Sequence, residues 1–243
     1  MSEFNQSQTY VNQAGVTLQA YITRVFTLMG GALAVTALVS FAGFNLVSAA
    51  LASESMATVA VVIFFAAMIA QFALCFALSR RIATLQTRTA TILLYGYAVV
   101  TGITFSVLPM VYDGSTLFSA FAFSAVLFFS CAVIGHTTNV DLTKFSGLLI
   151  GGLIAMVIAT IASMFIPALR ESLFISYIGV ILFLFLTAWD MQKIKSYYYG
   201  TQGGVGQMGG NLAVYGAFQL YLDFINLFMQ ILRILGSRSR SKH

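Results

Sequence analysis

The sequence LAVYGAFQLYLDFINLFMQILRILG, residues 212–236, carries the strongest indication of how this chain folds. It is apolar over more than the roughly 20 residues that a helix needs to cross a bilayer, yet Asp223 stands near its middle. No other charge lies between Lys195 and Arg233. A charged side chain at that depth costs at least ~2.5 kcal/mol. We therefore predict that Asp223 belongs to a functional site.

The composition extends this interpretation to the whole chain. Hydrophobic residues make up 59% of its 243 residues and charged residues only 8%, whereas a soluble domain carries about 25% charged residues. The sequence therefore predicts an all-α membrane protein, a seven-transmembrane-helix bundle with no separate soluble domain. The other uncharged runs cover residues 25–53, 55–79, 89–112, 114–140, 145–169 and 172–189.

The predicted boundaries follow these runs. Residues 1–22 form a polar N-terminal segment without the basic start of a cleavable signal peptide, residues 23–236 form the membrane domain, and residues 237–243 form a basic C-terminal tail. The longest connection is predicted at 193–210, a flexible linker that contains GTQGGVGQMGG. Helices are predicted over residues 25–48, 57–79, 89–111, 116–136, 146–168, 172–192 and 211–236.

The distribution of lysine and arginine predicts the orientation, because cytoplasmic loops carry an excess of both. One side of the predicted bundle receives Arg170 alone, so the N-terminus is predicted to be cytoplasmic. Seven spans place the basic tail outside, whereas a last segment that turned back would keep it inside. The opposite side receives Arg24, Arg80, Arg81, Arg88, Lys144, Lys193 and Lys195.

A second acid, Asp190, follows the uncharged run 172–189. Two costly acids on consecutive segments suggest a coupled pair with Asp223. Burial disfavours the charged form of a carboxyl group, and so does a second carboxylate nearby. The two groups are therefore expected to titrate as one unit, and they are predicted to sense pH.

Polar residues around Asp223 recur at helical spacing. Gln219, Asn226 and Gln230 share one stripe of the last segment with Asp223. A helix that is polar on one stripe belongs inside a bundle, where the stripe faces other helices or water. Thr101 and Thr104 form a weaker stripe on the third segment. The plainer interpretation of these uncharged residues is hydrogen bonding between helices.

Two motifs, WDMQKIK at 189–195 and LYLDFINLFMQILRILG at 220–236, resemble the Bax inhibitor-1 family, also called the transmembrane Bax inhibitor motif family, and its bacterial members in particular. SRR at 79–81, TGITFSVLPMVY at 101–112 and GHTTNVDL at 135–142 extend the resemblance over nearly all the chain after residue 20. The resemblance implies a seven-helix fold with the last helix central, a place in the bacterial inner membrane, pH-dependent calcium leak and a part in stress response.

The resemblance also assigns roles to residues. The family's di-acid pair corresponds to Asp190 and Asp223, and the arginine that latches onto it corresponds to Arg80, with Arg81 adjacent. The acid that some members carry on the second helix has no counterpart, and Gln71 is only a nearby polar residue. Calcium takes six to eight oxygen ligands, so the two aspartates are expected to bind it weakly and transiently. No cofactor is expected. Calcium enters the prediction as the transported ion and not as a resident cofactor.

Three alternative functions have to be weighed against this prediction. An intramembrane aspartyl protease also places one aspartate on each of two neighbouring helices, but its second motif needs glycines where this chain reads LYLD. We therefore expect no enzyme. A non-conducting regulator of other membrane proteins and a proton-coupled transporter would share the same pair. The expected partners are calcium, protons and anionic lipids, with membrane proteins left open and nucleic acid excluded.

Overall fold

The computed structural model describes residues 16–50, 52, 54–82, 84–166, 169 and 172–240, which form helices and connections without a strand. Seven helical spans within these residues are long and apolar enough to cross a membrane, so the chain is a multi-pass membrane protein, as predicted. The helices are α2 (Leu18–Ala50), α3 (Glu54–Arg81), α4 (Thr87–Phe105), α5 (Leu108–Val111), α6 (Gly114–Thr137), η1 (Leu142–Phe145), α7 (Ser146–Phe165), α9 (Leu173–Gly200) and α10 (Gly206–Arg240).

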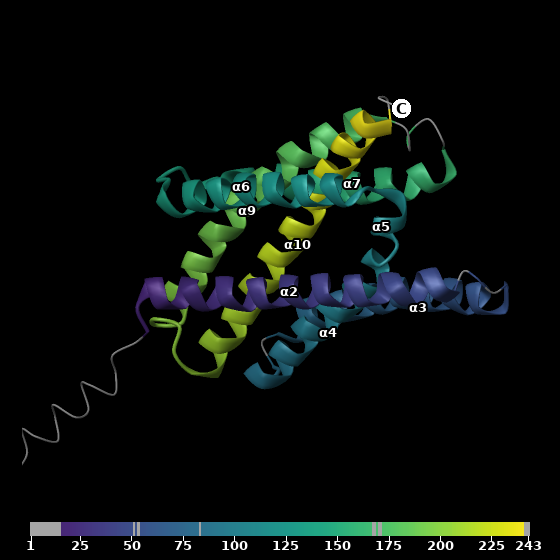
Figure 1. The fold of residues 1–243 in the computed structure, drawn as a ribbon. Helices are drawn as coiled ribbons and strands as arrows, with labels where there is room; N and C mark the ends of the chain where they lie inside the picture. The colour runs from purple at the N-terminus through teal and green to yellow at the C-terminus, as the bar shows by residue number, and fades with distance from the viewer. Residues whose placement is uncertain are drawn as a thin grey trace, which may run out of the picture.

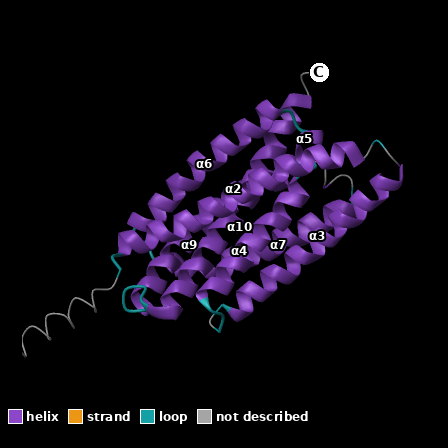
Figure 2. Cartoon of the chain, turned by 60° about the horizontal axis from the view of Figure 1, so that its bottom comes forward, coloured by secondary structure: helices purple, strands orange, loops and turns teal. Residues whose placement is uncertain are grey.

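The helices form two groups (Figure 1). In one group α2, α3 and α4 pack against one another, and in the other α9 packs against α6 and α7. The last helix, α10, contacts α9 and α6 of the second group and α2 and α4 of the first. The turned view in Figure 2 shows the same helices as one elongated bundle.

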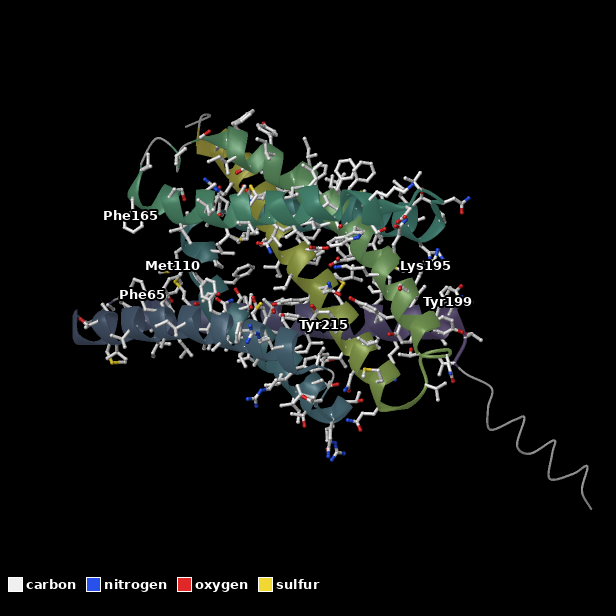
Figure 3. The ribbon with its side chains drawn as sticks, turned by 180° about the vertical axis from the view of Figure 1, so that it is seen from behind. Phe65, Met110, Phe165, Lys195, Tyr199 and Tyr215 are labelled. Atoms are coloured by element: carbon white, nitrogen blue, oxygen red, sulfur yellow. The ribbon has the colours of Figure 1, made fainter. Side chains whose placement is uncertain are left out.

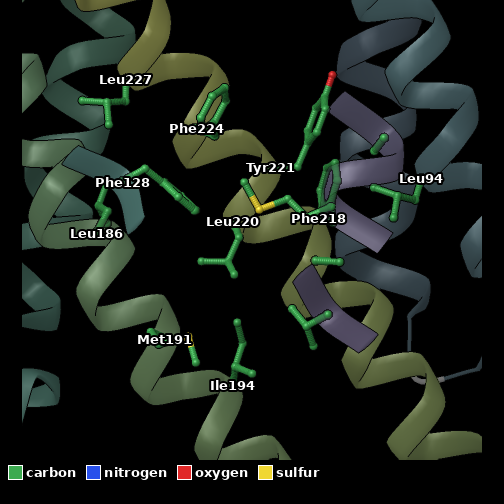
Figure 4. Close-up of a cluster of buried hydrophobic side chains, with 14 of the residues drawn as sticks. Leu94, Phe128, Leu186, Met191, Ile194, Phe218, Leu220, Tyr221, Phe224 and Leu227 are labelled. Carbon is green, nitrogen blue, oxygen red and sulfur yellow. The ribbon is translucent and has the colours of Figure 1, made fainter. Parts of the chain in front are cut away.

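The last helix, α10, contributes much of the buried interior of the bundle. No residue from Gly209 to Ser237 is exposed, and α10 packs mainly against α9, α6, α2 and α4. Its aromatic residues interlock with both groups, as Figure 4 shows for Phe218, Tyr221 and Phe224. The Phe224 ring lies 5.5 Å from Phe128 of α6, and the Phe218 ring lies 5.2 Å from Tyr97 of α4.

The outer surface is apolar, as hydrocarbon surroundings require. Phe72 of α3 and Phe118 of α6 are 71% and 73% exposed. A lipid tail is as apolar as leucine, so burying such side chains between helices brings no hydrophobic gain. Polarity rather than hydrophobicity therefore decides which helix lies inside.

The predicted linker at 193–210 is wrong. The α9 helix continues to Gly200 and α10 begins at Gly206. The run after Asp190 becomes polar, which ends the apolar signal but does not end a helix. The short turn between the helices uses left-handed backbone at Gln202 (φ 52°) and Gly203 (φ 92°), a conformation that glycine adopts without steric cost.

The third span differs from its prediction as a single helix over 89–111. The α4 helix ends at Phe105, and the short helix α5 starts at Leu108. Pro109 explains the break, because proline lacks a backbone N–H and its ring clashes with the carbonyl four residues earlier, which here belongs to Phe105. The amide of Ser106 instead donates to the carbonyl of Ile103 at 3.3 Å.

The ends of the chain also differ from their predicted boundaries. The first helix begins at Leu18, and α10 continues through Arg240 into the predicted tail. Because α10 runs without turning back, its last turn lies at the opposite end of the bundle from Leu18, as seven spans require (Figure 1). Residues 1–15 of the N-terminal segment, residues 241–243 of the tail, Arg170 and Glu171 lie outside the described residues.

Candidate functional site

The interface between α9 and α10, called the seam below, carries the candidate site. Toward its Gly200 end, a Cβ built on Gly216 would lie 2.7 Å from Cγ1 of Ile194. Toward the other end, a Cβ built on Gly179 would lie 2.8 Å from Cγ of Gln230. These two close contacts fix the register of the antiparallel helices. The two predicted aspartates fall between them, at one level of the seam.

Both aspartates are buried, Asp190 with 5% and Asp223 with 6% of its surface exposed. Oδ1 of Asp190 lies 2.5 Å from Nζ of Lys193, one turn further along α9. Asp223 interacts electrostatically with Asp190 and Lys193 and lies beside Thr187. Its Oδ2 atom is buried and has no hydrogen-bond partner among the described residues. The structure therefore brings the predicted pair into one electrostatic unit.

Lys193 belongs to this unit and was not among the predicted site residues. Its Nζ lies 3.9 Å from the centre of the Trp189 ring, on the preceding turn of α9. Spacing could have identified it, because residues three apart share a helix face. The same rule finds Thr187, three residues before Asp190, whose hydroxyl donates to the carbonyl of Phe183 at 2.8 Å.

Polar groups continue from the aspartates toward the Gly200 end of the seam. The Tyr197 hydroxyl donates to Oε1 of the predicted lining residue Gln219 at 3.1 Å. Tyr215 interacts with Asp190 and with the Ser79 side chain of α3. Figure 3 places Lys195 and Tyr199 toward one end of the molecule, Phe165 and Met110 toward the other, and Tyr215 between them.

The remaining predicted lining residues of α10 differ in their surroundings. Nδ2 of Asn226 donates to the carbonyl of Leu222 in its own helix at 2.8 Å. Gln230 is buried, and its Oε1 atom has no hydrogen-bond partner among the described residues. Gln230 therefore stays available as lining, whereas the Asn226 amide is used locally.

Thr101 and Thr104 lie in a second polar cluster, on α4. Nε2 of Gln71 donates to Oγ1 of Thr101 at 3.0 Å, which ties α3 to α4. The Thr101 hydroxyl donates to the carbonyl of Tyr97, and the Thr104 hydroxyl to the carbonyl of Thr101. Hydrogen bonding between helices, the plainer interpretation, describes Thr101 in this structure.

The predicted latch residues lie away from the aspartates in this conformation. Arg80 and Arg81 are exposed at the end of α3. The guanidinium carbon of Arg80 lies 4.6 Å from the centre of the Phe76 ring in its own helix. The cation beside Asp190 is Lys193 instead. A contact between Arg80 and the pair stays a prediction for another state.

Outside the spans, Asp141 provides a contrasting carboxylate. It begins η1, where its Oδ1 accepts from the hydroxyl of Thr143 at 2.5 Å and from its backbone N–H at 3.0 Å. These bonds, chiefly that of the hydroxyl, hold the pKa of Asp141 below its usual range. Within the described ranges, no cluster of three or more His, Cys, Asp or Glu side chains could hold a metal ion.

The amino-acid sequence of the chain matches a known protein family. The family model described as "Inhibitor of apoptosis-promoting Bax1" matches residues 18–240. The inner membrane protein YbhL of Escherichia coli (strain K12) is 35% identical over 240 residues, which cover 98% of this chain and 100% of that protein. A protein of Borreliella burgdorferi is 34% identical over 220 residues, 90% of this chain and 92% of that protein. A Rickettsia prowazekii protein is 39% identical over 151 residues, 62% of this chain and 63% of its own.

Proposed function

This chain belongs to the Bax inhibitor-1 family, and from that premise and the seam we propose that it is a pH-sensitive calcium leak pathway, gated by Asp190 and Asp223. The observation that carries the proposal is the buried pair with a single lysine beside it. Catalysis by the pair is no part of the proposal.

Counting charges explains why such a pair would respond to protons and calcium. Two ionised carboxylates and one ammonium group leave one net negative charge inside the bundle. A buried charge without a partner is costly. A proton on either carboxylate removes the excess. A calcium ion bound between the two ionised carboxylates balances both of their charges and leaves the ammonium group unpaired. Protons and calcium therefore compete for the same two side chains.

The site would hold calcium only briefly. Two aspartates supply at most four oxygens of the six to eight that calcium prefers, so water and neighbouring oxygens must complete its shell. Weak binding suits passage, because an ion on a conducting path must also leave. Channel and carrier share this requirement, and the geometry of the pair fits both.

The latch of the proposal is Arg80, with Arg81 beside it. Ser79 of the same helix end interacts with Tyr215, which interacts with Asp190. In the proposed closed state α3 turns about its axis by roughly the 100° that separates successive residues of a helix, which brings the Arg80 guanidinium toward the pair. Lys193 and Arg80 would then alternate as the cationic partner of Asp190, one in each state.

We further propose a bacterial inner membrane location with the N-terminus in the cytoplasm. The excess of lysine and arginine at the Arg81 end of the bundle supports this orientation. The name of the Escherichia coli relative, an inner membrane protein, supports the location. Anionic lipid headgroups would be the surface partners of this basic end. A part in stress response belongs to the same proposal.

Calcium flux into proteoliposomes of the purified protein, measured from acid to neutral pH, tests the proposal. Asp223→Asn keeps the shape of the side chain and removes its titration, so the pH dependence should flatten. Asp141→Asn is the matched control, because it removes an exposed carboxylate outside the spans and should leave the profile unchanged. A wild type that conducts no calcium at any pH would favour the non-conducting regulator instead. An unchanged profile in Asp223→Asn would make the pair structural.

A further inference from the structure

Two more buried polar groups stand at the outer end of the seam, between the aspartates and the Arg240 end. The side chains of Ser176 on α9 and Gln230 on α10 are buried, with 0% and 8% of their surfaces exposed. The Ser176 hydroxyl oxygen and the Gln230 Oε1 have no hydrogen-bond partner within the described part of the chain. Inside a membrane protein, unpaired polar atoms are costly unless water or a ligand reaches them.

A glycine makes room for the Gln230 amide. A Cβ on Gly179 would lie 2.8 Å from Cγ and 2.9 Å from Cδ of Gln230, and 2.8 Å from Cε of Met156 on α7. Any larger residue would push the amide away. Ser176 lies one turn before Gly179 and shares its face of α9. Met156, which is 7% exposed, covers this corner, so the two polar groups are separated from the lipid.

We propose that Ser176 and Gln230 form a hydrated cation station on the outer half of the seam, with Gly179 as the residue that leaves room for the Gln230 amide. The proposal rests on the calcium leak proposed above and extends it to a second binding point. A hydroxyl and an amide oxygen are the hard, uncharged ligands that calcium accepts alongside water. Because they carry no charge, the station would pass a partly hydrated ion on to or from the aspartates without retaining it.

Water access tests the station independently of flux. In a chain with Cys75→Ala and Cys131→Ala, a membrane-impermeant thiol reagent is applied to proteoliposomes that carry Gln230→Cys or Ile178→Cys. Ile178 lies next to Gly179, at the depth of Gln230, and is 44% exposed on the lipid face. We expect labelling at least about tenfold faster at 230 than at 178, because only the interior position meets water. Equal rates, or faster labelling at 178, would overturn the station.

Flux tests whether ions use the station. Gln230→Leu removes the oxygen and should lower calcium flux about fivefold, the effect of one lost hydrogen-bonding group. Gln230→Glu keeps the length of the side chain and adds a charge, so it should lower the calcium concentration that half-saturates flux, and it decides the matter if the leucine variant does not fold. Neither variant changing flux, while Asp223→Asn flattens the pH profile, would overturn the station and leave the leak intact. If the wild type conducts no calcium, the proposed leak is wrong. The labelling rates alone then decide whether the station is hydrated.

Discussion

The seam and α3 differ in the relation between polarity and burial. Among the seven candidate spans of the described residues, α10 is the least apolar and the most buried, with 61% of its most apolar 18 residues buried. The α3 helix is the most apolar, with 6% of the corresponding residues buried. A soluble protein would show the reverse order. In a bilayer the helix that carries Asp223 must be surrounded by protein, because lipid cannot solvate its charge.

The comparison also separates what is fixed from what can shift. The α10 helix makes its main contacts with α9, α6, α2 and α4, whereas α3 packs chiefly on α4 with smaller contacts to other helices. Few contacts make a displacement cheap. If the site has a moving part among the described helices, α3 is the favoured one, and the aspartates are the fixed part.

The largest effect is expected at Lys193. Replacing it with methionine keeps the length of the side chain but removes the cation 2.5 Å from Asp190. Removing one partner of a fully buried ion pair typically costs 3–5 kcal/mol. Because Lys193 is 22% exposed, we expect a loss at the lower end, about 3 kcal/mol, in reversible unfolding by detergent. Adding Asp190→Asn should recover part of this loss, because the buried charge left behind is then gone.

Lys195→Met is the matched control for this experiment. Lys195 is the next lysine of α9 and lies at the end of the bundle, where its Nζ donates to the carbonyl of His136 at 2.8 Å. Its removal should cost much less, since it leaves no carboxylate unpaired. Equal losses in the two variants would mean that the seam is no more sensitive to charge than the surface.

The second effect concerns the packing beside the seam. A Cβ on Gly135 of α6 would lie 2.3 Å from the carbonyl oxygen of Ala188 on α9, so Gly135→Ala must push the two backbones apart. We expect a loss of about 1–3 kcal/mol in the same unfolding measurement. Gly151→Ala on α7 is the control, because nothing lies within 4 Å of its Cβ.

The control variant Gly151→Ala is expected to have an effect of its own. Gly147 and Gly151 have the GxxxG spacing that is typical of close helix packing, yet neither has a neighbour within 4 Å of an added Cβ. That packing is therefore not made among the residues that the structure describes, and alanine at position 151 should stabilise the helix by up to ~1 kcal/mol through its propensity. A loss at position 151 as large as that at 135 would contradict this.

Sequence predicted the membrane spans well because each apolar run is long, and it predicted their ends poorly. The run at 172–189 sets where α9 lies in the membrane, but the polar residues that follow it stay helical up to Gly200. Pro109 stands in the predicted third span, and the clash of its ring with the carbonyl of Phe105 is sufficient to predict the break after α4. The length of an apolar run indicates which residues lie in the hydrocarbon layer of the membrane. The end of a helix depends instead on local backbone hydrogen bonds.

The site could be predicted in part for a related reason. Asp190 and Asp223 stood out because their cost is intrinsic to the residue. Lys193 did not, because it was counted as a loop charge when the predicted helix ended at 192. Ser176 and Gly179 are ordinary residues of an apolar run, and only the register of α9 against α10 shows what they face.

A third and smaller effect lies where α10 meets α2. The Tyr221 hydroxyl and Oγ1 of Thr36 are 2.7 Å apart and buried. Tyr221→Phe removes this bond, which in membrane proteins is worth about 0.6 kcal/mol on average. A double-mutant cycle with Thr36→Val isolates it. Tyr199→Phe, at a residue that is 64% exposed, should change nothing, and a coupling energy of zero between 221 and 36 would contradict the contact.

The smallest effect on stability is expected at Arg80, and it is the sharpest test of α3 as the moving part. Arg80 is exposed and touches Phe76 of its own helix, so Arg80→Ala should change the free energy of unfolding by no more than about 0.5 kcal/mol, as at other surface sites. Its effect should be on flux, because losing a latch raises basal calcium leak without weakening the fold.

Arg81→Ala is the matched control, since it removes the same charge from the same helix end. An arginine that only reaches toward lipid phosphate would leave flux unchanged at either position. A rise in leak with Arg81→Ala but not with Arg80→Ala would shift the latch by one residue. If neither variant changes the leak, no arginine of this helix end closes the path, and Lys193 would be the cation that accounts for both states of Asp190.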